Sequence, residues 1–376
     1  MSIAFMAYGI RYAYGIVAPE MATSLGINEA QVGLVYSSFL GVYTATSLLV
    51  GFLVDVKDLR RVVLLFLPLF ALGTGLMGLV GNLPEAALAF GIAGAGASVG
   101  WTPLVVWVQR AYPTRRGIYL GLLQIGCNLG FGTLGLLLPF IVGNLGWRAA
   151  WELLGLAAAA WLIPITAMAG GATLPERRDP SLSRYLDDMA SALRERAFWQ
   201  GGLSYMLASY AIMTPLAFSA SYAVSMGASD AEGGALFTLI GLVGIAGALG
   251  LPSLSDRVGR PRALTINNAI MALGLAGSAL AGSYWALAAW TSLIGISYGG
   301  VWVLYAALAR DLYGGEVAGG VMGAWTLLAG IGLLLSPPLG GLLVDASRGY
   351  GLAYLVAAAA AALSLVFAAV AHRPSK

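Results

Sequence analysis

The chain has 376 residues, of which 59% are hydrophobic and only 10% are charged. An ordinary soluble domain carries about 25% charged residues, so this chain has too few to cover a soluble core of its length. We therefore expect lipid to be the solvent for much of the exterior, and we predict an all-α polytopic membrane protein. The net charge of +3 is too small to indicate a nucleic-acid partner.

Apolar segments of about 20 residues, long enough to cross a hydrocarbon core of about 30 Å, recur along the chain between short polar breaks. Several breaks carry glycine turn signals, such as Gly146 and Gly349. The first segment has Arg11 at its centre and no basic residue before it, so we interpret it as a retained helix and not as a signal peptide. The segments predict twelve transmembrane helices, at about residues 2–24, 30–54, 60–80, 85–110, 116–143, 149–171, 198–224, 230–255, 262–282, 285–310, 317–343 and 350–371.

The distribution of basic residues agrees with twelve crossings. Placing the N-terminus in the cytoplasm assigns 17 of the 20 lysines and arginines to inner loops or to the C-terminal tail. The outer loops then hold only Arg148 and Arg348, and Arg11 lies inside the membrane. Because cytoplasmic loops are enriched in Lys and Arg, we predict that both termini are cytoplasmic and that the protein is a multi-pass protein of the cell membrane, the plasma or inner membrane.

The longest polar stretch follows the sixth predicted helix and divides the crossings six and six. We therefore expect an N-terminal six-helix bundle at 1–171, a cytoplasmic linker at 172–197 and a C-terminal six-helix bundle at 198–376. Within the linker, Leu182, Leu186, Met189 and Leu193 recur at helical spacing, which is typical of an amphipathic helix on the membrane surface. A solvated linker is an equal alternative for its first half.

A short motif occurs at corresponding positions of the two predicted bundles. Each copy places an aspartate, Asp55 or Asp256, at the cytoplasmic end of a helix, and a cluster of basic residues follows it. The second copy is the better match, because Asp58 stands where the first copy should have its central glycine. In these residues and in its predicted topology, the chain resembles the major facilitator superfamily of transporters, which implies two pseudo-symmetric six-helix bundles.

The motif residues are candidates for a gate. A carboxylate at a helix end accepts hydrogen bonds from the N-terminus of a neighbouring helix and pairs with nearby arginines. Such contacts would hold the cytoplasmic side closed in one state and break in the other; alternatively, the charges only fix the orientation of the chain. The candidate gating residues are Asp55, Arg60, Arg61, Asp256, Arg257 and Arg260.

Arg11 is the candidate for substrate binding. It lies near the middle of the first predicted helix, where a charge costs roughly 2.5–3.5 kcal/mol on insertion scales, and no carboxylate lies at comparable depth in the sequence. A cation without an internal anion indicates a water-filled cavity, an anionic substrate, or both. The alternative is a structural arginine that donates hydrogen bonds to helix carbonyls or tyrosine hydroxyls.

Other polar and aromatic residues at membrane depth could line the same cavity. Tyr8 and Tyr12 share a helical face with Arg11, and Gln124 and Asn128 are four residues apart on the fifth helix. For each aromatic residue alone, packing is the simpler interpretation. The candidate lining residues are Tyr8, Tyr12, Tyr43, Gln124, Asn128, Tyr210, Tyr298, Trp302 and Trp325.

The first two helices resemble the organic-anion branches of the superfamily: the anion:cation symporters, the organophosphate antiporters and the monocarboxylate carriers. The resemblance to the first two branches is carried by Arg11, Ala18-Pro19, Leu25-Gly26, Gln31, Gly33-Leu34, Ser38-Phe39, Tyr43, Gly51 and Asp55. The tyrosine-rich first helix, with Gly9 before and Gly15 after, resembles the monocarboxylate carriers. It implies that Arg11 contacts the anionic group and that Tyr43 and Gln124 line the site.

The chain departs from these branches at their other charged positions. Ile10 stands where the sugar-acid symporters have an aspartate, and the small residues 94–97 replace their fourth-helix glutamate. The second arginines that the branches carry on helix seven or eight are also absent. The single positive site favours a singly charged organic anion of carboxylate type, moved by exchange, by facilitated diffusion or with a proton carried on the substrate.

Two other classes of function stay open. One is an efflux carrier for apolar or cationic compounds, although no acidic residue at depth would attract a cation. The other is a membrane sensor or lipid-handling protein that transports nothing. We do not expect an enzyme, a metal or a cofactor, because Cys127 and His372 are the only residues of their kinds. The expected partners are the lipid bilayer and a small anionic molecule, and we expect a functional monomer.

Overall fold

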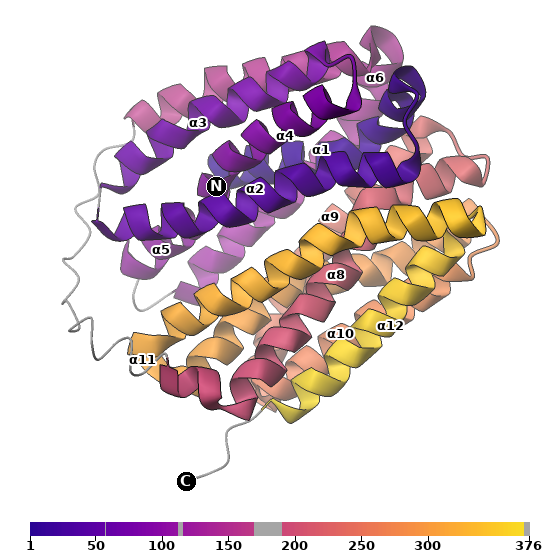
Figure 1. The fold of residues 1–376 in the computed structure, drawn as a ribbon. Helices are drawn as coiled ribbons and strands as arrows, with labels where there is room; N and C mark the ends of the chain where they lie inside the picture. Colours follow the sequence, from indigo (N-terminus) through magenta and orange to yellow (C-terminus); the bar gives the residue numbers. More distant parts are fainter. Residues whose placement is uncertain (57, 112–115, 169–189, 372–376) are drawn as a thin grey trace.

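The computed structural model describes residues 1–56, 58–111, 116–168 and 190–371, and within them it is all helical, without strands (Figure 1). The elements are α1 (Ser2–Leu25), α2 (Glu29–Val56), α3 (Leu59–Leu76), η1 (Met77–Leu79), α4 (Leu83–Ala97), η2 (Ser98–Gly100), α5 (Thr102–Ala111), α6 (Arg116–Met168), α8 (Arg196–Ser225), α9 (Asp230–Val258), α10 (Arg260–Ala279), α11 (Tyr284–Ser347) and α12 (Gly351–Val370).

Two of these helices each contain two of the predicted segments. In α6 the break falls at Gly146, whose φ of 81° and ψ of 161° are non-helical and easily reached only by glycine. Eight helical stretches in the described part of the chain are long and apolar enough to cross a membrane, two of them within α11. The prediction of an all-helical membrane protein is therefore confirmed, whereas twelve crossings and cytoplasmic termini stay predictions.

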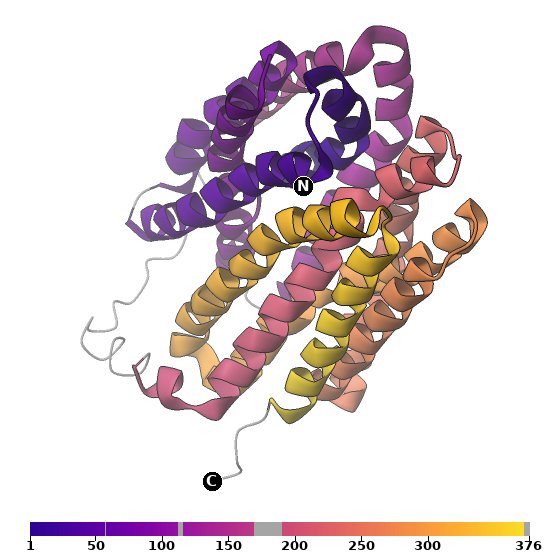
Figure 2. The ribbon, with the colours of Figure 1, turned by 45° about the vertical axis from the view of Figure 1, so that its right-hand side comes forward.

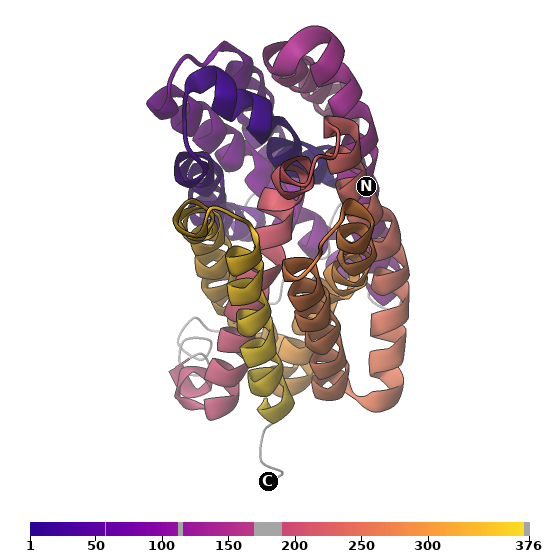
Figure 3. The same cartoon turned by 90° about the vertical axis from the view of Figure 1, so that its right-hand side faces the viewer.

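The chain folds into two halves that lie side by side (Figure 1, Figure 2 and Figure 3). The first half, coloured indigo to magenta, contains α1 to α6, and the second, coloured rose to yellow, contains α8 to α12. They meet mainly through α2 with α11, α6 with α9, and α1 with α8. Of the predicted linker, residues 172–189 lie outside the described part, and residues 190–194 are helical.

The contact between α2 and α11 runs from the Glu29 end of α2 to its middle. A Cβ atom on Gly33 would lie 2.5 Å from the carbonyl oxygen of Pro337, so the two backbones touch here. One turn further on, the hydroxyl of Ser37 donates to the carbonyl oxygen of Leu334 at 2.8 Å. We call the end of the molecule that carries Glu29 the outer end, and the end that carries Arg260 the basic end, following the predicted topology.

The contact between α6 and α9 covers the same part of the molecule. The hydroxyl of Thr238 donates to the carbonyl oxygen of Gly132 at 2.7 Å, and a Cβ atom on Gly234 would lie 2.4 Å from the carbonyl oxygen of Gly135. Small residues allow such close approach where lipid offers no hydrophobic driving force between helices. Both helix pairs therefore hold the outer halves of the two bundles together.

Polar contacts close the outer end itself. The hydroxyl of Tyr350 donates to Oε1 of Glu29 at 3.1 Å, and the backbone N–H of Ala30 lies 3.4 Å from Oδ2 of Asp345. A cavity of about 560 Å³ lies between the two halves at this point, lined in part by Glu29, Asp345 and Tyr350. Burial and the neighbouring Asp345 raise the pKa of Glu29, although the hydrogen bond from Tyr350 acts in the opposite direction.

We predict that Gly33→Ala weakens the closed outer end. Its Cβ atom must push α2 away from Pro337, and overpacking of this kind typically costs about 1–3 kcal/mol. We expect a lower apparent melting temperature in detergent and a longer spin-label distance across the outer end. Gly143→Ala is the matched control, because a Cβ atom there meets nothing within 4 Å. Equal behaviour of the two variants would show that the contact is loose.

Glu29→Gln tests whether the polar contacts of Glu29 stabilise the closed outer end. Because the pKa of Glu29 is raised in the closed structure, its stabilising contribution is complete below the ordinary glutamate pKa and is lost as the pH rises through the raised pKa. The wild-type melting temperature should therefore fall over this pH interval by more than that of Glu29→Gln, which cannot ionise. Parallel pH profiles would mean that Glu29 is freely hydrated.

Candidate functional site

Arg11 lies in α1 with 4% of its surface exposed. Its guanidinium stands over three tyrosine rings, with distances from Cζ to the ring centroids of 5.7 Å for Tyr8, 5.3 Å for Tyr12 and 5.0 Å for Tyr43. Cation–π contacts of this kind are worth about 0.5–2 kcal/mol each. They surround the charge with aromatic faces but do not neutralise it.

The guanidinium of Arg11 keeps unused hydrogen-bonding capacity. Its Nε and Nη2 atoms are buried and have no hydrogen-bond partner among the described residues. A buried unpaired donor costs about 1–3 kcal/mol, and more when it is charged. The arrangement is thus incomplete without an acceptor, and a carboxylate is the acceptor that matches a guanidinium in charge and in shape.

Helical spacing explains the first half of this cluster. Residues three and four apart on a helix share a face, so Tyr8 and Tyr12 accompany Arg11, while Tyr43 reaches the same point from α2. Gly15 then allows α1 to approach the second half, because a Cβ atom on it would lie 2.7 Å from the carbonyl oxygen of Leu216 in α8. The cluster is consequently placed at the boundary between the two halves.

Tyr298 on α11 joins the cluster from the second half. Its hydroxyl donates to the hydroxyl of Tyr12 at 3.3 Å, and the centroids of the two rings are 6.0 Å apart. Phe131 on α6 packs against both rings, with centroid distances of 5.2 Å in each case. Trp302, one turn from Tyr298 on α11, lies 6.3 Å from it. We call Tyr8, Arg11, Tyr12, Tyr43, Phe131, Tyr298 and Trp302 the central cluster.

Gln124 and Asn128 form a buried pair on α6. The amide of Gln124 donates to Oδ1 of Asn128 at 3.0 Å, and Asn128 is one turn before Phe131. The Nδ2 atom of Asn128 is buried without a partner, and it would lie 2.9 Å from a Cβ atom on Gly244 in α9. The pair therefore lies at the boundary between the halves, as the sequence predicts for lining residues.

Two of the predicted lining residues have other neighbours. The indole N–H of Trp325 donates to the carbonyl oxygen of Phe198 at 2.8 Å, within the second half. The backbone of Tyr210 packs against Gly332 on α11, and its side chain is partly exposed. The contacts of the described residues do not join either residue to Arg11, so their roles stay predictions.

The sequence interpretation did not single out Tyr36, Phe131 and Tyr205. Tyr36 lies two turns before Tyr43 on α2, and its buried hydroxyl lies near the guanidinium of Arg11. That spacing was a signal that could have found it. Phe131 and Tyr205 enter the site only through contacts between helices, for which a single sequence gives no signal.

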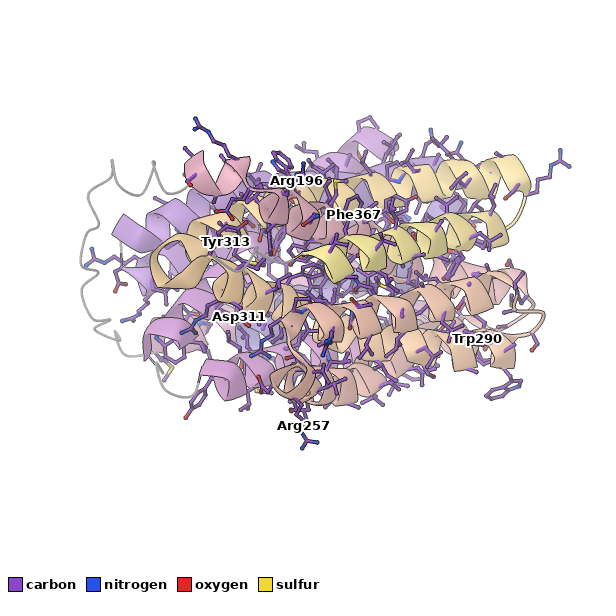
Figure 4. All side chains as sticks on the ribbon, turned by 90° about the horizontal axis from the view of Figure 1, so that it is seen from below. Arg196, Arg257, Trp290, Asp311, Tyr313 and Phe367 are labelled. Atoms are coloured by element: carbon purple, nitrogen blue, oxygen red, sulfur yellow. The ribbon has the colours of Figure 1, made fainter. Side chains whose placement is uncertain are left out.

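The second motif copy makes a network within its own half. Arg260 pairs with Asp256 at 2.7 Å and lies 3.4 Å from Oδ2 of Asp311 on α11; its guanidinium also bonds to Ser255. Gly259 makes the turn before Arg260 with a φ of 88°, which explains the glycine of the motif. Arg257 projects away from the molecule (Figure 4).

Only some side chains of the first motif copy are among the described residues. Arg60 donates to the carbonyl oxygens of Thr166, at 3.2 Å, and Ala167, both at the end of α6. Arg61 is exposed. The side chain of Asp55 lies outside the described residues. Arg60 and Arg260 thus bind within their own halves in this structure, and the role of the motif as a gate stays a prediction.

The described residues contain no group of three or more His, Cys, Asp or Glu side chains that could hold a metal ion. The polar groups that the central cluster offers, apart from its tyrosine hydroxyls, are nitrogen donors: the guanidinium of Arg11, the indole of Trp302 and, beside them, the amide of Asn128. Such a set fits an anion better than a cation.

Several curated proteins are similar along nearly the whole chain. Monocarboxylate transporter 4 of Mus musculus is 26% identical over 375 residues, which cover 94% of this chain and 78% of the relative. Monocarboxylate transporter 3 of Rattus norvegicus is 27% identical over 379 residues, covering 97% and 76%. A probable sulfoacetate transporter, SauU of Cupriavidus necator, is 28% identical over 163 residues, covering 42% and 37%.

Solved structures share the fold. The nucleoside transporter NupG superposes with a TM-score of 0.77 at 14% identity and covers 97% of this chain and 96% of its own. A bacterial homologue of the human lysosomal transporter Spinster, in an inward-facing and unoccupied conformation, has a TM-score of 0.74 at 15% identity, covering 98% and 93%.

The sequence model of the Major Facilitator Superfamily matches residues 1–281 and, in a second match, residues 201–376. Together the matches span the chain, in agreement with the helical fold and the resemblance carried by the paired motifs. The relatives and structural neighbours named above are transporters, not enzymes. The chain is therefore a membrane transporter that belongs to the Major Facilitator Superfamily.

Proposed function

We propose that this transporter moves a small organic anion with a single carboxylate, and that Arg11 binds the carboxylate. The observation that carries the proposal is the buried guanidinium, which has two unpaired donor atoms and no carboxylate among its described contacts. A substrate carboxylate would supply the missing acceptors in bidentate geometry. It would also offset the one charge that the cluster places at membrane depth.

The charge of the cluster sets the charge of the substrate. One guanidinium neutralises one carboxylate, and no second cation is found among the central cluster residues. A dianion would carry an uncompensated charge through a low-dielectric site, which is costly. The aromatic rings of Tyr43 and Phe131 fit the short apolar part of such a molecule. Two relatives are named for the same chemical class, the monocarboxylates.

Transport by alternating access fits the contacts between the halves. Rocking of two bundles around a midplane site is the general scheme for transporters built from repeats. Here the two halves touch at the outer end, through Gly33 with Pro337 and Thr238 with Gly132, while Arg60 and Arg260 at the basic end bind within their own halves. This arrangement supports a state closed toward the outside and open toward the predicted cytoplasm.

Arg11→Gln is the test of the anion site. We expect the variant to fold, with an unchanged or higher melting temperature, because it loses a buried charge that costs roughly 2.5–3.5 kcal/mol. In liposomes, exchange of radiolabelled benzoate or lactate should fall at least tenfold. Arg11→Lys should fail as well, since an ammonium keeps the charge but not the planar pair of donors.

The matched control is Arg194→Gln, which removes an exposed arginine far from the cluster in sequence. A thermal-shift panel of acetate, lactate, benzoate, succinate, benzamide and tetraethylammonium separates the candidate substrates, because a ligand at 100 times its dissociation constant stabilises by about 2.7 kcal/mol. Stabilisation by the monocarboxylates alone supports the proposal. Stabilisation by tetraethylammonium alone, or normal exchange by Arg11→Gln, would favour the efflux alternative.

The gate is tested with Asp256→Asn. In the state described here Asp256 pairs with Arg260, so the substitution should cost little stability, about 0–1 kcal/mol for an exposed pair. If the motif closes the basic end in the opposite state, exchange should slow severalfold. Asp230→Asn, at the outer end of the same helix, is the control. Normal exchange by Asp256→Asn would leave the motif with an orienting role only.

A further inference from the structure

The indole N–H of Trp302 is a second unused donor of the central cluster. Its Nε1 atom is buried and has no hydrogen-bond partner among the described residues, although a buried N–H without a partner costs free energy. Trp302 is on α11, so this donor comes from the second half of the molecule, whereas Arg11 comes from the first. The inference built on it rests on the proposed function.

Ring contacts connect Trp302 to Arg11. The ring centroid of Trp302 lies 6.3 Å from that of Tyr298. The hydroxyl of Tyr298 donates to the hydroxyl of Tyr12, and the guanidinium of Arg11 lies over the ring of Tyr12. The ring contacts thus run from one unpaired donor to the other through Tyr298 and Tyr12, whose rings touch across the boundary between the halves. A small molecule held by Arg11 is bordered by side chains of both bundles.

Trp302 packs against an aromatic stack that a buried polar network holds in place. Tyr205 packs against Trp302 with centroids 5.8 Å apart and stacks on Tyr305 at 4.4 Å. The hydroxyl of Tyr305 lies 2.6 Å from that of Ser204 and accepts from the amide of Asn268 at 3.1 Å. These bonds join α8, α10 and α11, so they fix the aromatic stack that sets the position of Trp302.

Two fully buried tryptophans, Trp325 and Trp151, show why this one is distinctive. Trp325, on the same helix, donates its N–H to the carbonyl oxygen of Phe198 and has no capacity left. Trp151 also has a buried N–H without a partner, but it packs against Phe90 inside the first half. Among these residues, Trp302 alone combines a free N–H with the ring contacts of the central cluster.

We propose that the indole N–H of Trp302 donates to the substrate carboxylate, so that the anion is held by Arg11 of the first half and by Trp302 of the second. The N–H is neutral, and it therefore adds a hydrogen bond without adding charge, which keeps the site matched to a monoanion. A carboxylate held in this way bridges the two bundles. Trp302 then determines specificity for the anionic head and not for the apolar tail.

Trp302→Phe tests the assignment, because it keeps an aromatic ring and removes the N–H. The purified protein is titrated with benzoate and with lactate, and dissociation constants are measured by calorimetry. A hydrogen bond to a charged group corresponds to roughly a tenfold change in affinity or more, so both dissociation constants should rise about tenfold. Trp151→Phe, which removes the same group away from the cluster, should bind both acids like the wild type.

A spectroscopic measurement separates this role from packing. With ¹⁵N-labelled indole, the Trp302 signal, assigned by its loss in Trp302→Phe, should move downfield when benzoate is added to the wild type, while the Trp151 signal stays in place. Wild-type affinity in Trp302→Phe, or a Trp302 signal that does not respond to bound benzoate, would overturn the inference and leave Arg11 unaffected. If the wild type binds neither acid, the proposed function fails together with it.

Discussion

The buried guanidinium of Arg11 is the constraint on which the rest of the site depends. Lipid cannot hydrate it and the described residues offer it no carboxylate, so the fold has to surround it with polarisable rings and a boundary that opens to water. Tyr8, Tyr12 and Tyr43 supply the rings. Gly15 lets α1 approach α8, so the tyrosine rings around the charge border the second half, where Tyr12 meets Tyr298. In the proposed function, the residue that destabilises the empty site is also the one that selects the substrate.

Much of the fold was predictable because lipid imposes a strict rule on the sequence. Every backbone polar group in hydrocarbon needs an internal partner, so each crossing must be a long apolar helix, and the breaks must carry turn residues. Gly146 illustrates this, since its positive φ falls where the sequence shows a turn signal. The continuity of α11 across the predicted loop between residues 310 and 317 was not predictable, because glycine-rich segments there are compatible with a turn or with a helix.

The residues of the site likewise divide into those that the sequence predicts and those that it does not. Positions on one helix follow from periodicity, which is why Tyr8 and Tyr12 were placed correctly beside Arg11. Partners across helices depend on rotation and tilt, which a single sequence does not encode. Phe131 therefore went unnoticed, and Trp325, chosen for its depth, donates its N–H to Phe198 within its own half. Whether a deep aromatic residue packs or binds is settled by what its polar atom already contacts.

Charge and close packing together suggest how binding couples to movement. The outer end is held by backbone contacts such as that of Gly33 with Pro337, and such contacts are strong only at short range. Under the proposed alternating access, the outer end would therefore switch between a closed and an open arrangement with little between them. Closing both ends at once would seal an unneutralised guanidinium away from water. The proposed substrate carboxylate would remove that penalty, because the pair would enter the closed intermediate with no net charge. The empty carrier would keep the penalty, and in the proposed mechanism this difference would tie the rocking of the bundles to an occupied site.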